Sequence, residues 1–190
     1  MGVKAVMTLA LAAVVSERKK AEEEMRGLAV TDAATGLANY RRFIDALEGE
    51  IRRSERSGRS FALLVLDLDN LKKINDRHGH LVGTRALCRL ADVLRMHCRA
   101  VDTAARFGGD EFALILIETG EAVARQVARR ISRELALDGE KPEVSVSVGL
   151  AVYPRDGDTV ETLLRAADTS MYETKCRDRQ DPKRRTVKRN

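Results

Sequence analysis

The chain has 190 residues, of which 44% are hydrophobic and 33% are charged, and its formal net charge is +5. These values predict one domain with a real core and a modest extension. The chain lacks tryptophan, and residues 181–190 form a basic tail without aromatic residues, so nucleic-acid binding is disfavoured and a disordered tail is expected. Three cysteines without a CxxC pair indicate reduced thiols rather than a disulfide framework or a zinc site.

Residues 1–30 are expected to form an apolar segment and a helical stalk ahead of the domain. The uncharged stretch from Ala5 to Val15 is shorter than the ~20 residues of a membrane-spanning helix. It is the remnant of a span, a signal-like segment or the apolar end of the stalk. A stalk that pairs with a second copy and a lone amphipathic helix fit the weak heptad pattern equally well. The apolar positions of that pattern are Leu11, Val14, Ala21, Met25 and Leu28.

The first predicted elements of the domain are a helix and a strand. Asn39 is a candidate N-cap for a helix that runs to about Ser57 and is closed by Gly58. The apolar run from Phe61 to Leu66 predicts a strand, which ends abruptly at Asp67. We therefore expect an acidic side chain at the carboxyl end of the first strand.

A polar loop, a helix and a hairpin are predicted next. Asp69 to Gly83 has the composition of a glycine-bearing loop, and Leu81 to His97 has one apolar helical face. Ala104 to Ile117 is typical of a hairpin with the two glycines at its tip. The unbroken apolar run from Phe112 to Ile117 predicts that its second strand is covered on both faces.

The remaining elements are two helices that flank one strand. A helix is predicted from about Glu121 to Leu135, a strand from Val144 to Val152, and a last amphipathic helix from about Val160. The inward positions of the first of these helices are predicted to be Val123, Val127, Ile131 and Leu135. The fold class is therefore α/β (α+β), with a ferredoxin-like or palm βαββαβ core whose mainly antiparallel sheet is flanked by helices.

Acidic residues occur where two of the predicted strands meet. Asp67 ends the first strand, and Asp110 with Glu111 opens the strand after the hairpin. Because the first and third strands of such a sheet are neighbours, these acids are expected at the same edge. Oxygen ligands of this kind suit Mg²⁺, which takes one or two carboxylates plus phosphates and water. The alternative is that Asp67 and Asp69 only cap the strand end.

The ordered motifs of the chain resemble those of the GGDEF domain family, the diguanylate cyclases. The resemblance covers about residues 31–180, which we take as the nucleotidyl cyclase domain, and its ordered matches make it highly specific. The signature is Gly108-Gly109-Asp110-Glu111-Phe112. The other matches are Asp32, Thr35-Gly36-Leu37, Asn39, Leu66 to Asp69, Lys72, Ile74 to Asp76, Gly79-His80, Gly83, Arg99 to Asp102, Ser147 to Gly149, Ala167-Asp168, Tyr172, Lys175 and Arg179.

The resemblance implies that two subunits of a homodimer each bind one GTP and condense the pair to cyclic di-GMP and pyrophosphate. It implies two Mg²⁺ ions per site, with Mn²⁺ as an alternative, held by Asp67, the Leu68 carbonyl oxygen, Asp110 and Glu111. The implied GTP contacts are Leu71, Lys72, Asn75, Thr84, Gly108, Gly109, Lys175 and Arg179. A nucleotide substrate of this kind implies a cytoplasmic protein, or the cytoplasmic part of an inner-membrane protein.

Three further positions bear on regulation and on base choice. Arg99 and Asp102 match the RxxD site at which members of the family bind their product and are inhibited. Thr84 stands where the family usually has Asp, so guanine selection is expected to relax and cyclic GMP–AMP becomes an alternative product. A catalytically silent receptor for cyclic dinucleotides is a further alternative, although Asp67, Asp110 and Glu111 favour the enzyme.

Overall fold

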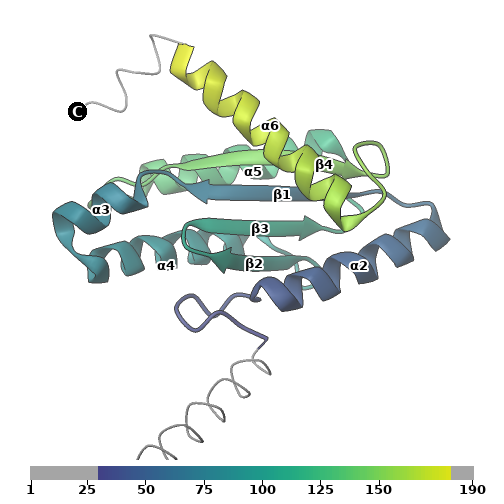
Figure 1. Ribbon diagram of the computed structural model, residues 1–190, viewed down its shortest axis with the longest axis horizontal. Helices are drawn as coiled ribbons and strands as arrows, with labels where there is room; N and C mark the ends of the chain where they lie inside the picture. The colour runs from purple at the N-terminus through teal and green to yellow at the C-terminus, as the bar shows by residue number, and fades with distance from the viewer. Residues whose placement is uncertain (1–29, 181–190) are drawn as a thin grey trace, which may run out of the picture. The chain divides into compact units, whose positions relative to one another are not determined.

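The computed structural model describes residues 30–180, with side chains described as far as Cys176. The predicted apolar segment and stalk, apart from Val30, and the predicted basic tail lie outside the described residues. In Figure 1 the described part is a layered arrangement of helices on a sheet. Its elements are α2 (Tyr40–Ser57), β1 (Phe61–Leu68), α3 (Leu71–His78), α4 (His80–His97), β2 (Thr103–Gly108), β3 (Glu111–Leu116), α5 (Glu121–Leu137), β4 (Val146–Tyr153) and α6 (Val160–Gln180).

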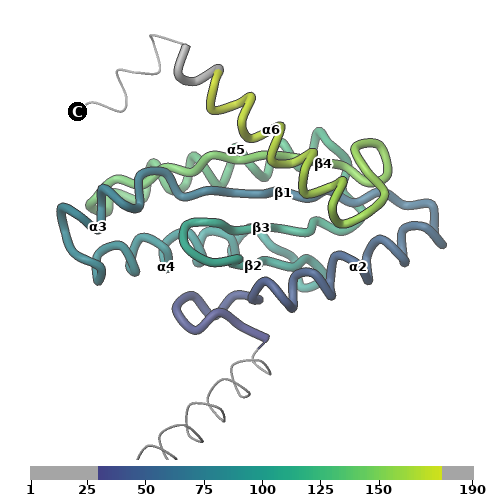
Figure 2. The backbone as a smooth tube through the Cα atoms, viewed as in Figure 1, coloured from purple at the N-terminus to yellow at the C-terminus, as the bar shows by residue number. Residues whose placement is uncertain are grey.

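The sheet has four strands in the order β2-β3-β1-β4, and every neighbouring pair is antiparallel. Figure 2 shows β1 running through the middle of the sheet, between β3 and β4. The predicted α+β class and the antiparallel βαββαβ core are therefore confirmed. The first and third strands are neighbours, as the topology required, and the hairpin turns at its two glycines.

The sheet is buried on both faces, which explains the continuous apolar runs of β1 and β3. Alternate residues of β1 point to opposite faces, and each buried Leu or Phe contributes about 1.5–3 kcal/mol. One face packs on α4 and α5 through Leu64, Leu66, Leu90, Leu94, Ile131 and Leu135. The other packs on α2 and α6 through Phe43, Leu47, Phe61, Leu63, Leu163 and Ala167.

The ends of α2 are set by two local residues, as predicted. The side chain of Asn39 accepts a hydrogen bond from the backbone N–H of Arg42 at 3.0 Å, which satisfies one of the free donors of the first turn. Gly58 takes a left-handed conformation with φ of 70° and ends the helix. The three cysteines are free thiols, in agreement with the prediction.

Two predictions about local structure are wrong. The segment from Asp69 to Gly83 is not a loop, because it contains α3 and the first turn of α4. Only two positions of α3 are buried, Leu71 and Ile74, and two apolar positions among polar residues are too few to reveal a helical period. Val123 does not face inward but is 45% exposed, and Ala124 occupies the buried position instead. The apolar face of α5 is therefore offset by one residue in its first turn.

Candidate active site

The predicted acidic residues meet at one edge of the sheet. Asp67 of β1 and Glu111 of β3 are register partners, and the Leu68 N–H donates to the Asp110 carbonyl oxygen at 2.9 Å. Antiparallel pairing places the end of β1 beside the start of β3, although Asp67 and Glu111 are 44 positions apart in the sequence. Three carboxylates thus gather at the hairpin, as the topology predicted.

The negative charge at this edge is only partly compensated. Burial and the charges of Asp110, Asp168 and Asp67 raise the pKa of Glu111 above its ordinary value, while Lys175 acts in the opposite direction. The Lys175 ammonium donates a hydrogen bond to Asp67 Oδ1 at 3.0 Å. The edge therefore attracts cations, and α6 supplies one from the protein itself.

Asp168 was not among the predicted site residues, although it belongs to the matching motif. It lies two helical turns before Lys175 on α6, and positions seven apart share one face of a helix. Its charge acts on Glu111, and burial raises its own pKa above the ordinary value. The spacing from Lys175 was the signal that would have found it.

Asp69 makes structural hydrogen bonds and does not join the carboxylates of the candidate site. Its two carboxylate oxygens accept hydrogen bonds from the hydroxyls of Ser145 at 2.6 Å and Ser147 at 2.7 Å. These contacts tie the segment after β1 to the start of β4. Of the two acids in the Asp-x-Asp pattern, Asp69 fits the structural alternative and Asp67 faces the charged edge.

The carboxylates fit a divalent cation that also binds a substrate. Burial and the charges of Asp110, Asp168 and Asp67 disfavour the ionised form of Glu111, and a bound cation would relieve both effects. Among residues 30–180, no three or more His, Cys, Asp or Glu side chains form a ready metal cage. This donor set suits Mg²⁺, which commonly completes its shell with substrate phosphates and water.

The hairpin tip is open. Gly108 and Gly109 have φ values of 146° and 54°, which favour glycine over residues with a Cβ. A Cβ added at either position would meet no protein atom within 4 Å. Backbone conformation, and not crowding within the chain, therefore selects glycine here, and the tip leaves space beside its backbone.

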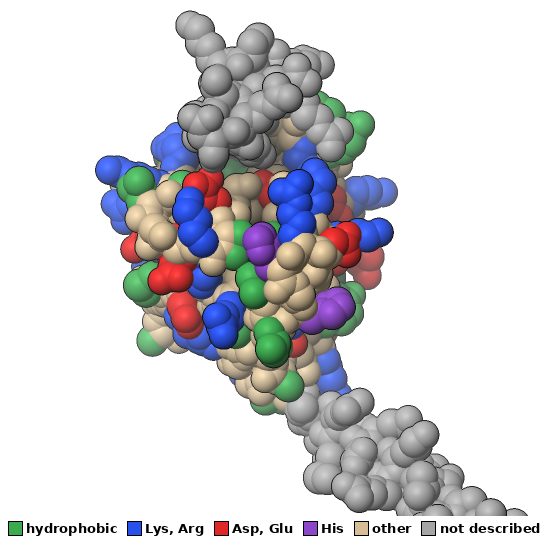
Figure 3. Space-filling model, turned by 90° about the vertical axis from the view of Figure 1, so that its left-hand side faces the viewer, with side chains coloured by type: hydrophobic (Ala, Val, Ile, Leu, Met, Phe, Trp, Pro, Cys, Tyr) green, Lys and Arg blue, Asp and Glu red, His purple; other side chains and the backbone are tan. Residues whose placement is uncertain are grey.

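The predicted base-contacting residues lie together on α3 and α4. A Cβ on Gly83 would collide with the Asn75 amide oxygen, so Asn75 lies directly over Gly83. The adjacent Thr84 hydroxyl donates to the His80 carbonyl oxygen at 3.0 Å. Leu71, the first residue of α3, is buried, whereas Lys72 is exposed. In the view of Figure 3, histidine and basic side chains share this end of the molecule with acidic ones.

The remaining predicted site residues differ in how far the structure describes them. Both oxygens of Asp102 accept backbone hydrogen bonds, from Arg99 N–H at 2.9 Å and from Ile117 N–H at 3.0 Å. Arg99 itself is exposed, so its guanidinium remains accessible. The side chain of Arg179 lies outside the described side chains.

Searched from residue 30 to residue 180, the chain contains no helix with the length and apolarity of a membrane span.

Comparison with known proteins identifies relatives that match most of the chain. The chain is 41% identical over 165 residues to an uncharacterized signaling protein of Caulobacter vibrioides, covering 84% of this chain and 20% of that protein. It is 40% identical over 161 residues to the bifunctional diguanylate cyclase/cyclic di-GMP phosphodiesterase MucR of Pseudomonas aeruginosa, covering 82% and 23%. The chain thus spans about a fifth of the length of these two relatives.

A solved structure and a family profile agree with these relatives. The crystal structure of the coiled coil and GGDEF domain of DgcB from Caulobacter crescentus, in complex with c-di-GMP, has a TM-score of 0.71 and 28% identity. That match covers 93% of this chain and 95% of the DgcB chain. The family described as diguanylate cyclase, GGDEF domain, matches residues 29–181. The chain therefore belongs to the GGDEF domain family.

Proposed function

We propose that this chain is a diguanylate cyclase that condenses two GTP molecules into cyclic di-GMP and pyrophosphate. The observation that carries the proposal is the edge at which Asp67, Glu111 and Lys175 meet beside the open glycine tip. This arrangement supports a site in which the carboxylates would bind metal ions and Lys175 would bind phosphate. The family described as diguanylate cyclases and the diguanylate cyclase function named for MucR support the same reaction.

The chemistry is an in-line displacement at the α-phosphorus of GTP. The 3′-oxygen of one GTP forms a bond to the α-phosphorus of the other, the bond to the pyrophosphate oxygen breaks, and Asp110 accepts the 3′-hydroxyl proton. Repetition in the opposite sense closes the ring. Asp67, the Leu68 carbonyl oxygen, Asp110 and Glu111 would hold two Mg²⁺ ions, or Mn²⁺. Bound there, such ions lower the pKa of the hydroxyl and stabilise charge on the phosphates.

Phosphate and base binding are assigned to α3, α4 and α6. Lys175 would exchange Asp67 for a substrate phosphate, with Arg179 beside it along the helix. Leu71 and Lys72 would lie along the phosphates, and Gly108 and Gly109 would let the backbone approach the nucleotide. Asn75 would hydrogen-bond the guanine edge from its position over Gly83.

Thr84 supports a second candidate product. Its hydroxyl donates to the His80 carbonyl oxygen, and a threonine has no carboxylate to accept from two guanine N–H groups. A site that lacks such an acceptor discriminates less strongly against adenine. A relaxed cyclase that makes cyclic GMP–AMP from GTP and ATP is therefore the alternative within the same reaction.

Dimerisation and product inhibition complete the proposal. Each subunit holds one GTP, so a homodimer must bring two sites together, and residues 1–30 would control that approach as a stalk. The exposed Arg99, with Asp102, would bind cyclic di-GMP and restrain the enzyme. Residues 31–180 would form the cyclase domain and 181–190 a basic tail, in a cytoplasmic protein or the cytoplasmic part of an inner-membrane protein.

Product analysis tests the proposal and separates it from a catalytically silent receptor. Purified protein is incubated with Mg²⁺ and GTP, or GTP plus ATP, and the products are resolved by chromatography and mass spectrometry. Cyclic di-GMP from GTP alone supports the cyclase, and cyclic GMP–AMP from the mixture supports relaxed base choice. Asp110→Ala is expected to abolish turnover while binding of cyclic di-GMP is retained. An Asp110→Ala variant with the wild-type rate would overturn the assignment of the site.

A further inference from the structure

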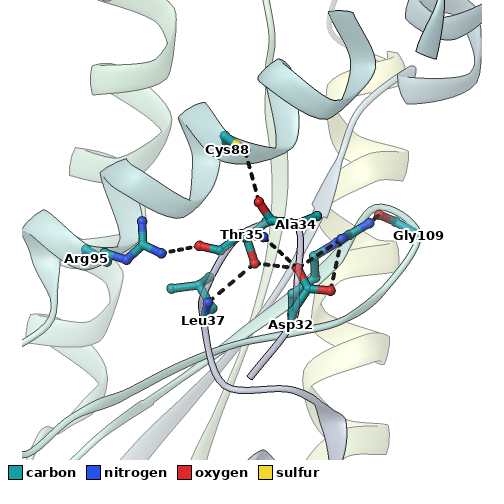
Figure 4. Close-up of polar contacts among 8 residues, drawn as sticks. Asp32, Ala34, Thr35, Leu37, Cys88, Arg95 and Gly109 are labelled. Carbon is teal, nitrogen blue, oxygen red and sulfur yellow. Dashed lines mark hydrogen bonds and ion pairs between the residues drawn. The ribbon is translucent and has the colours of Figure 1, made fainter. Parts of the chain in front are cut away.

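Arg106 of β2 contacts Asp32, which lies 74 positions earlier in the sequence, and Gly109 at the tip of its own hairpin. Its Nη1 donates to Asp32 Oδ1 at 3.1 Å and to Oδ2 at 3.2 Å. Its Nε and Nη2 donate to the Gly109 carbonyl oxygen at 3.2 and 2.7 Å. Figure 4 shows Asp32 and Gly109 close to one another, with dashed lines that mark the contacts near them. The guanidinium therefore holds the hairpin tip and the turn before α2 at the same time.

The turn at residues 31–38, named here the N-terminal turn, is itself tightly held. Asp32 Oδ1 also accepts from the Thr35 backbone N–H at 2.9 Å and from the Thr35 hydroxyl at 2.6 Å. Arg95 of α4 donates to the Thr35 carbonyl oxygen. The turn thus has one defined conformation in which its carboxylate faces Arg106.

The N-terminal turn also extends the sheet beyond β2. The Ala38 N–H donates to the Ala104 carbonyl oxygen at 3.1 Å, and the Arg106 N–H donates to the Ala38 carbonyl oxygen at 2.9 Å. Leu37 is buried in the core beside this pairing. Backbone pairing and the Asp32–Arg106 ion pair therefore join the turn to β2 immediately before the strand reaches Gly108.

The chemistry of the link requires arginine. The Arg106 and Asp32 side chains are 12% and 22% exposed, so solvent screens the pair less than it screens a surface ion pair. A planar guanidinium presents several N–H groups in fixed directions and reaches two acceptors at once, whereas a lysine ammonium is a point charge on a flexible stem. Burial opposes the charged form of Asp32, but hydrogen bonds from Thr35 and Arg106 outweigh it and hold its pKa below the ordinary value.

We propose that Arg106 is a positioning residue that orients the Gly109 carbonyl group, and with it the adjacent Asp110, according to the position of the N-terminal turn. The inference rests on the proposed cyclase function. Gly108 and Gly109 make the tip conformationally permissive, so a side chain that anchors its carbonyl oxygen limits where Asp110 can lie. The segment before residue 31 is covalently continuous with the turn, so a displacement of that segment acts on the reacting site within one subunit.

Three variants and one control test the link. Arg106→Lys keeps the positive charge but removes the planar guanidinium that reaches two acceptors. Asp32→Asn removes the negative charge of the partner, and the double variant combines the two changes. Arg59→Lys is the matched control, because Arg59 pairs with Glu118 at the other end of the hairpin and both side chains are exposed. Each protein is assayed for kcat and KM with GTP, for its thermal midpoint, and for hydrogen exchange in a peptide that covers residues 107–112.

Arg106→Lys is expected to lower kcat by about tenfold or more with KM within about twofold, and to speed exchange at the tip. Asp32→Asn should give the same changes more weakly, and the double variant should be no worse than Arg106→Lys, because both changes break one link. Arg59→Lys should match the wild type in all three measurements. Additive losses, or equal kcat and tip exchange in Arg106→Lys and Arg59→Lys, overturn the inference.

The exchange measurement separates this inference from the proposed function. A wild-type protein without turnover would contradict the cyclase, yet tip exchange would still report whether Arg106 orders residues 107–112. If exchange is faster in Arg106→Lys but the wild type has no turnover, Arg106 still orders residues 107–112, and the proposed effect on catalysis is wrong. Active wild-type protein with unchanged tip exchange in the variant would remove the link and leave the cyclase in place.

Discussion

Lys175 and Asp67, 108 positions apart in the chain, form a hydrogen-bonded ion pair with an Nζ–Oδ1 distance of 3.0 Å. The pair joins α6 to the end of β1 at the acidic edge. Its side chains are 30% and 25% exposed, and partly exposed ion pairs of this kind contribute only about 0–1 kcal/mol to stability. The contact therefore adds little to the stability of the fold, and we propose that its role is to hold a cation where metal and phosphate would bind.

Lys175→Met should separate these roles. Without nucleotide, the variant should bind Mn²⁺ more tightly than the wild type, because no ammonium competes for Asp67. With GTP, kcat/KM should fall by about tenfold or more, because a charge-assisted phosphate contact is lost. Calorimetric titration with Mn²⁺ and steady-state assays measure the two effects. Lys141→Met, which removes an exposed pair with Glu143, is the control and should change neither. Unchanged Mn²⁺ affinity in Lys175→Met would contradict the competition.

Gly83→Ala should displace Asn75. A Cβ at position 83 would collide with the Asn75 amide oxygen, so the variant should lose about 1–3 kcal/mol of stability and show a higher KM for GTP. Gly49→Ala is the opposite case, because Gly49 lies within α2 with no atom within 4 Å of an added Cβ. That variant should gain about 0.5–1 kcal/mol and keep its KM. Denaturant unfolding and GTP titration compare them, and an equal KM in both would argue against Asn75 as a base contact.

Glu111→Gln should stabilise the metal-free protein in a pH-dependent way. Burial and the charges of Asp110, Asp168 and Asp67 raise the folded pKa of Glu111 above 4.5. The folded state then binds this proton more tightly than the unfolded chain, so stability is lost as pH rises from about 4.5 through the folded pKa. The thermal midpoint of Glu111→Gln, measured with EDTA, should exceed that of the wild type at pH 7.

The advantage of Glu111→Gln should disappear below about pH 4.5, where Glu111 is protonated in both states. Glu55→Gln, on the exposed surface of α2, should show no comparable difference at either pH. The Gln variant should also lose turnover, because the substitution removes a predicted metal ligand. A constant midpoint difference across the whole pH range would show that the gain does not come from the charge of Glu111.

Arg99→Ala and Asp102→Ala should differ in stability although both belong to the proposed product site. The Asp102 carboxylate accepts the backbone N–H groups of Arg99 and Ile117, and removing it leaves a partly buried donor unpaired at a cost of about 1–3 kcal/mol. The exposed Arg99 side chain should cost less than about 0.5 kcal/mol. Cyclic di-GMP titration and thermal unfolding test this, and equal stability losses would contradict the structural role of Asp102.

The sequence determined those features that depend on local pattern or on topology. The apolar run of β1, the glycine pair of the hairpin and the Asn39 cap each have a local physical cause, so their positions were predicted correctly. The adjacency of Asp67 and Glu111 also followed from the sequence, because the βαββαβ order makes the first and third strands antiparallel neighbours. The motif residues then identified the family.

The tertiary structure decided features that depend on how elements pack. Only Leu71 and Ile74 of α3 are buried, which is too few positions for a periodic pattern in the sequence. Several contacts join residues far apart in the chain. Asp69 pairs with Ser145 and Ser147 at the start of β4, Lys175 contacts Asp67, and Arg106 contacts Asp32. Such contacts depend on strand register and on the placement of helices over the sheet, which residue types alone do not specify.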